Sequence, residues 1–145
     1  MSTAKKGSAA KKPAANKSKT PPLPELRIPV SRVNDTLSIP DICVAMPLTI
    51  IFYFDPNSLS GATFDGLPAG TSAFAFSAPL PTSGEFGKPS VDSKVHEVHV
   101  TDYHAMVMTR SYVLAAVYKG KTYTTSSAVT IAQQGGPGGG IIINK

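Results

Sequence analysis

Short runs of alternating side chains recur along this chain, and proline, glycine, asparagine and aspartate separate them. The clearest run is MPLTIIFYF at residues 46–54, in which every even-numbered position from 48 onward is apolar. Ile51 and Tyr53 make the opposite face largely apolar as well. Because a strand with two apolar faces is typical of the middle of a sheet, this run predicts a central strand.

The other apolar runs have the length and composition of strands. Phe74 and Phe76, for example, share one face of TSAFAFSA with the period of two that marks a half-buried strand. We expect strands at residues 26–33, 36–39, 46–54, 62–65, 71–78, 94–103, 110–119 and 121–131. No segment between them has the length of a crossover helix, so an α/β sheet is not expected. The pattern predicts an all-β sandwich of about six to eight strands.

Two apolar faces must cover each other in such a sandwich. One includes Phe52, and the other includes Tyr112 and Leu114, so we expect Phe52 and Tyr112 in the interior. Pro29 lacks a backbone N–H and suits only an edge position. Residues 79–90, PLPTSGEFGKPS, read as a long loop that exposes Phe86.

One stretch of the sequence resembles a known fold family. Residues 111–131, SYVLAAVYKGKTYTTSSAVTI, are similar to the last two strands of immunoglobulin-like and fibronectin type III domains, where a tyrosine-containing strand turns at a glycine into a final strand of alternating Val and Thr. The resemblance implies a β-sandwich of that class. The chain departs from antibody-type domains because it has no tryptophan and a single cysteine, Cys43.

The positive charge is concentrated at one end of the chain. The net charge is +5, but residues 1–19 alone carry +6, because they contain six lysines and no acidic residue. The lysines are Lys5, Lys6, Lys11, Lys12, Lys17 and Lys19. The other eight basic residues and all nine acidic ones give the rest of the chain a charge of −1. Six clustered lysines indicate nonspecific binding to nucleic acid or another polyanion.

This basic arm should be disordered. It contains almost no apolar side chain except alanine, so burial cannot offset the conformational entropy lost on folding. Its composition resembles the Lys/Ala/Pro tails of linker-histone-like proteins. We therefore divide the chain into a disordered arm and proline-rich linker (1–25), a β-sandwich domain (26–134) and a flexible glycine-rich tail (135–145). The tail contains Ile141–Ile143, which could dock on its own body, dock on a partner, or remain a frayed end.

Candidate chemistry is sparse. His96, His99 and His104 lie close together in sequence, but HEVH is one residue short of the HExxH zinc motif and lies in a predicted strand. Asp55 and the other aspartates that lie beside proline, glycine or serine are typical of turns, which their carboxylates organise. We find no phosphate-binding loop, nucleophile elbow or catalytic constellation. The sequence therefore predicts no metal site, no cofactor and no enzymatic activity.

Two functions remain open. The first is a structural or interaction protein whose body self-associates or docks on a partner while the arm binds a polyanion; its most concrete form is a virion or particle component. The alternative is a module that recognises carbohydrate or protein through its loops, with the arm as a solubility tether. No signal peptide is evident and no apolar run is long enough to span a bilayer, so we expect an intracellular protein.

Overall fold

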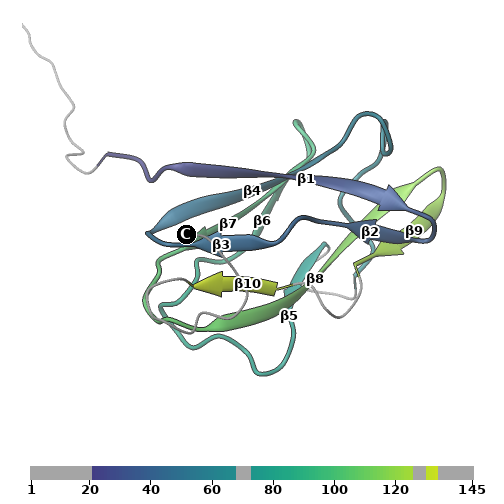
Figure 1. Ribbon diagram of the computed structural model, residues 1–145. Coiled ribbons are helices and arrows are strands. Elements are labelled where there is room, and N and C mark those ends of the chain that lie inside the picture. Colours follow the sequence, from purple (N-terminus) through teal and green to yellow (C-terminus); the bar gives the residue numbers. More distant parts are fainter. Residues whose placement is uncertain (1–20, 68–72, 126–129, 134–145) are drawn as a thin grey trace, which may run out of the picture.

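Every regular element that the structure describes is a β-strand. The computed structural model describes residues 21–67, 73–125 and 130–133 (Figure 1). Its ten strands are β1 (Glu25–Val33), β2 (Thr36–Ser38), β3 (Ile42–Val44), β4 (Leu48–Phe54), β5 (Phe74–Phe76), β6 (Ser90–Asp92), β7 (Glu97–Asp102), β8 (Thr109–Tyr118), β9 (Lys121–Thr124) and β10 (Thr130–Gln133). The all-β prediction is confirmed for this part of the chain, which also contains no helix that could cross a membrane.

The strands form two sheets. One has the order β2-β1-β4-β7-β6, and the other has the order β3-β10-β8-β5, with β9 paired to the end of β8. Figure 1 shows β1 and β4 above β8 and β10. Most neighbours are antiparallel, but β1 pairs with β4, and β3 with β10, in parallel.

The core lies between these sheets. Phe52 on β4 and Tyr112 on β8 are both 0% exposed, which confirms the predicted interior positions. The centroid of the Phe52 ring lies 5.6 Å from that of Tyr112 and 5.9 Å from that of Phe74 on β5. Because β4 is the third of five strands in its sheet, the prediction of a central strand at this run is also confirmed.

Pro29 does not place β1 at an edge, because β1 lies between β2 and β4. Its position is nevertheless tolerated. The carbonyls of Pro24 and Val30 accept hydrogen bonds from the backbone N–H groups of Thr49 and Asp55. The backbone N–H and C=O groups of the even-numbered residues therefore point toward β4. The missing N–H of Pro29 therefore points to the other side, where β2 pairs only with residues 31–33.

The structure has ten described strands rather than the six to eight that were expected, and the difference comes from short strands. Strand β3 was not predicted, and β6 begins at the last residue of the predicted 79–90 loop. The expected strand at 62–65 is reduced to one bridge between Thr63 and Val117. The range 121–131 holds two described strands, β9 and β10, which pair with different parts of β8. Tertiary pairing, rather than local propensity, sets these bounds.

The 79–90 loop is anchored to the body. Glu85 and Arg110 form a bidentate ion pair, with Glu85 Oε1 2.9 Å from Arg110 Nε and Oε2 2.7 Å from Nη2. Both side chains are only 4% exposed. The Phe86 ring packs on Phe76 with centroids 4.6 Å apart, so the prediction that Phe86 is exposed was wrong. The loop folds back because its buried acid has a cationic partner on β8.

Candidate binding site

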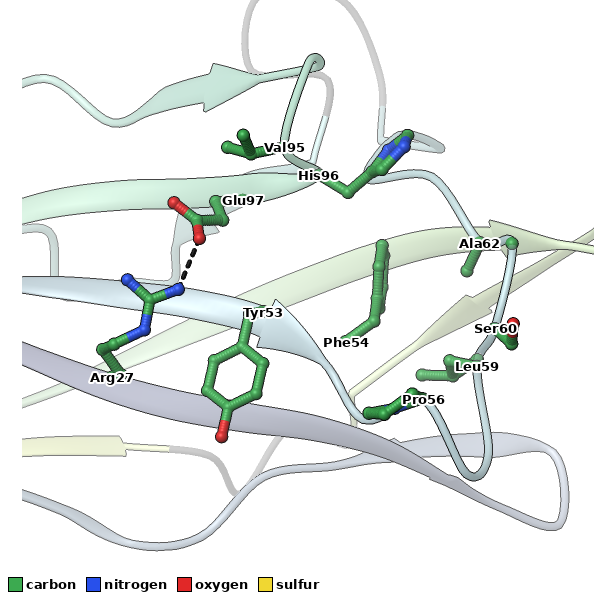
Figure 2. A pocket seen from close by; sticks show the side chains of 11 residues that line it. Arg27, Tyr53, Phe54, Pro56, Leu59, Ser60, Ala62, Val95, His96 and Glu97 are labelled. Carbon is green, nitrogen blue, oxygen red and sulfur yellow. Dashed lines mark hydrogen bonds and ion pairs between the residues drawn. The ribbon is translucent and has the colours of Figure 1, made fainter.

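A pocket of about 350 Å³ opens at the end of β4 (Figure 2). It lies between the segment that follows β4 and the turn that joins β6 to β7. The apolar lining comes from Phe54, Pro56, Leu59, Ala62 and Val95, and the polar lining from Arg27, Tyr53, Ser60, His96 and Glu97. An apolar surface with a few polar groups on one side is typical of small-ligand sites, and the volume is at the lower end of their range.

One wall of the pocket is a turn that begins at Asp55. Its carboxylate accepts a 3.0 Å hydrogen bond from the Asn57 backbone N–H, and its carbonyl accepts bonds of 3.1 and 2.9 Å from Ser58 and Leu59. Leu59 is fully buried, so it holds this turn against the core. The prediction that Asp55 organises a turn is thus confirmed.

The polar side of the pocket is an ion-pair network. Arg27 on β1 pairs with Glu97 on β7, as the dashed line in Figure 2 shows, and its guanidinium carbon lies 5.4 Å from the centroid of the Tyr53 ring. His99 Nε2 donates a 2.9 Å hydrogen bond to the other oxygen of Glu97. The bond from His99 lowers the pKa of Glu97, and Arg27 lowers it further against the opposing effect of burial. The pocket therefore presents an ionised carboxylate and a guanidinium side by side.

The three histidines do not converge on one site. His96 lies in the β6–β7 turn with a φ of 55° and lines the pocket, whereas His104 follows β7, where its backbone N–H donates a 2.8 Å hydrogen bond to Asp102. Only His99 belongs to a strand, so the prediction that His96 also lies in a strand was wrong. Among the described residues, no group of three His, Cys, Asp or Glu side chains could hold a metal ion.

A second polar cluster lies where the β1–β2 and β8–β9 hairpins meet. The Arg32 guanidinium carbon is 5.4 Å from the centroid of the Tyr118 ring and 5.7 Å from that of Tyr123. The ammonium groups of Lys119 and Lys121 lie over the same two rings, at 5.3 and 5.2 Å. Asp35 pairs with Lys121 at 3.0 Å. The cluster combines cations with aromatic rings, although one acid partly offsets its charge.

The site residues that were predicted from the sequence, Lys5, Lys6, Lys11, Lys12, Lys17 and Lys19, all lie outside the described residues. The pocket was not predicted. Its lining comes from β1, the end of β4, the segment that follows β4, the β6–β7 turn and the start of β7, and no local pattern indicates that these segments meet. The one available signal was the Asp-Pro-Asn turn after β4.

No protein-family model matches this chain, and no curated protein matches it.

Proposed function

We propose that this chain is a non-enzymatic structural or interaction protein. Its β body associates with itself or with a partner, and its lysine-rich arm binds a polyanion such as nucleic acid. The observation that carries the proposal is the separation of charge, +6 in residues 1–19 against −1 in the remainder. Release of counterions from phosphates favours such binding without reading a sequence. In its most concrete form the protein is a component of a virion or another particle, with the arm against the enclosed nucleic acid.

The body is proposed to belong to the immunoglobulin-like or fibronectin III-like sandwiches. The β8–β9 hairpin supports this assignment, because it turns at Lys119 and Gly120, whose φ values of 51° and 77° are both positive as a type I′ turn requires. The parallel pairs β1–β4 and β3–β10 are the feature that departs from purely antiparallel sheets of that class.

Replacing the six arm lysines with glutamine is expected to remove most nonspecific binding to single- or double-stranded nucleic acid. If all six contact phosphates, the logarithm of the binding constant should fall with the logarithm of salt concentration with a slope of about −4 to −5. Fluorescence anisotropy with a labelled oligonucleotide at several salt concentrations measures both quantities.

The matched control replaces the same six lysines with arginine, which keeps the charge and should keep both the affinity and the slope. If the glutamine variant binds as tightly as the unmodified chain, the arm is not the polyanion site. Binding would then be sought at the Arg32, Lys119 and Lys121 cluster.

A second candidate function is recognition of carbohydrate or protein through loops, and the pocket of Figure 2 favours it. Arg27 and Glu97 offer a donor and an acceptor beside apolar walls. That combination suits a ligand with both a hydrogen-bonding edge and an apolar face.

The substitution Ser60→Phe is expected to abolish any binding that uses this pocket. Ser60 is exposed on the pocket wall, so a larger side chain can fill the space without displacing the core. Ligands found on glycan and peptide arrays should be retested with Ser60→Phe and with Ser83→Phe, an exposed position outside the pocket. Equal binding by the two variants would exclude the pocket as the recognition site.

A further inference from the structure

Most of the large hydrophobic side chains that are exposed in the described residues lie at one end of the body. Seven of the nine belong to this end. They are Leu23, Met46, Leu80, Tyr103 and the run Met106–Met108, and we call them the apolar end. Val107 is the most exposed of the run, at 52%. An apolar surface of this kind on one side of a small domain usually marks a site of contact.

Strand register shows that these side chains share one end. The last residue of β7, Asp102, pairs with Leu48 at the start of β4, so the β7–β8 connection and the β3–β4 connection lie together. Strand β8 begins at Thr109, opposite Ala132 near the end of β10. In Figure 1 the residues before β1, the start of β8 and the end of β10 all lie at the left.

The apolar end is carried by loops that are already held in place. Thr82 Oγ1 donates to Glu85 Oε2 at 2.7 Å and lies 3.7 Å from Met106 Sδ, and the backbone N–H of Tyr103 donates to the Glu85 carbonyl at 3.0 Å. The buried Glu85–Arg110 pair then ties these two loops to β8. Because the surface is preformed, binding to it loses little conformational entropy from these loops.

The chain leaves the described part of the structure next to this surface. Ala132 pairs with Thr109, which immediately follows Met108, and β10 ends one residue later, at Gln133. Seven residues, 134–140, separate Gln133 from Ile141. At roughly 3.3 Å per residue the first isoleucine can lie up to about 26 Å from Gln133, far enough to reach Met108 and the loops around it.

We propose that Ile141–Ile143 of the same chain dock on the apolar end. It is unfavourable to leave three consecutive isoleucines in water, and equally unfavourable to expose the methionine, valine, leucine and tyrosine side chains of the apolar end. A contact between the two groups buries both. Residues 134–140, QGGPGGG, contain no strand-forming run that would hold Ile141–Ile143 away from the apolar end. The tail then covers a surface that its removal would leave open for self-association.

The test uses the methionine methyl groups, because three of the four methionines, Met46, Met106 and Met108, belong to the apolar end and Met1 does not. The full chain is labelled with ¹³C at these methyls and carries a nitroxide at Asn144→Cys in a Cys43→Ala background. We expect the Met106 and Met108 signals to disappear while the Met1 signal remains. Adding Ile141→Ser, Ile142→Ser and Ile143→Ser should strengthen these signals, because the nitroxide then approaches the surface only transiently.

A mixed sample separates docking within a chain from docking between chains. Nitroxide-labelled chains without ¹³C are mixed with ¹³C-labelled chains that carry no nitroxide. Full-intensity signals in the mixture support the proposal. Loss of the Met106 and Met108 signals there overturns it in favour of a second copy. Equal signal loss in the singly labelled chain with and without the three serines overturns it in favour of an undocked tail.

A label-free comparison keeps the proposal testable if the cysteine substitutions disturb the fold. In the otherwise unmodified chain, the triple isoleucine-to-serine variant should shift the Met106 and Met108 methyl signals, and Asn144→Ser should not. Identical spectra for the triple variant and the unmodified chain contradict docking. None of these readouts involves nucleic acid, so the result does not depend on the function proposed for the arm.

Discussion

Replacing Phe52 with alanine is expected to lower the free energy of unfolding by about 3–5 kcal/mol. The side chain is fully buried on the central strand β4 and contacts the rings of Phe74 and Tyr112 on the opposite sheet. Its truncation leaves a cavity where the two sheets meet. For a small domain this loss is a large part of the total stability, so the variant should be largely unfolded or strongly destabilised.

Urea denaturation followed by circular dichroism measures this effect. The control is Val95→Ala, because Val95 is 54% exposed and its truncation should change stability by less than about 0.5 kcal/mol. Phe86 is unsuitable as an exposed control, because its ring packs on Phe76. Equal losses for Phe52→Ala and Val95→Ala would contradict the core described above.

Breaking the Glu85–Arg110 pair is expected to lower the free energy of unfolding nearly as much as Phe52→Ala does. Either Glu85→Leu or Arg110→Met leaves one ionisable group buried without its partner, which typically destabilises a protein by about 3–5 kcal/mol. The double variant replaces both charges with apolar side chains and should be more stable than either single variant. Thermal or urea unfolding of the four proteins forms a complete double-mutant cycle. Simple addition of the two single losses would show that the pair contributes no coupling.

The same pair should make stability depend on pH in the acidic range. The hydrogen bond from Arg110, assisted by those from Thr82, lowers the pKa of Glu85 from 4.5 to about 2, although burial opposes the shift. The unfolded chain therefore binds the proton more readily than the folded one, and this contribution is fully present above pH 4.5 and lost as the pH falls towards 2. We expect the stability difference between the unmodified chain and Glu85→Leu to narrow over that range. A constant difference would mean that Glu85 is not held ionised by Arg110.

The side-chain alternation along the sequence was enough to predict the strand class and the centre of the core. In a strand, successive side chains point to opposite faces, so a local pattern of period two reports which face is buried. That is why Phe52 and Tyr112 were assigned correctly to the interior, and why the run at residues 46–54 was recognised as central. Turn chemistry is also local, and Asp55 organises the turn after β4 through bonds to residues two to four positions along the chain.

The pairing of strands and the contacts of loops depended on the tertiary structure. Alternation does not specify a neighbour, so it did not reveal β3 or that Pro29 lies in a strand with neighbours on both sides in the sheet order. The partner of Glu85 lies 25 residues away on β8, and that contact anchors a loop in which Phe86 is half-buried against Phe76. The pocket combines Arg27, Tyr53 and Glu97 from three strands that are adjacent only in the folded sheet. Local alternation thus determined which strand residues leave water, whereas long-range pairing decided what each of them meets and which loop residues are buried.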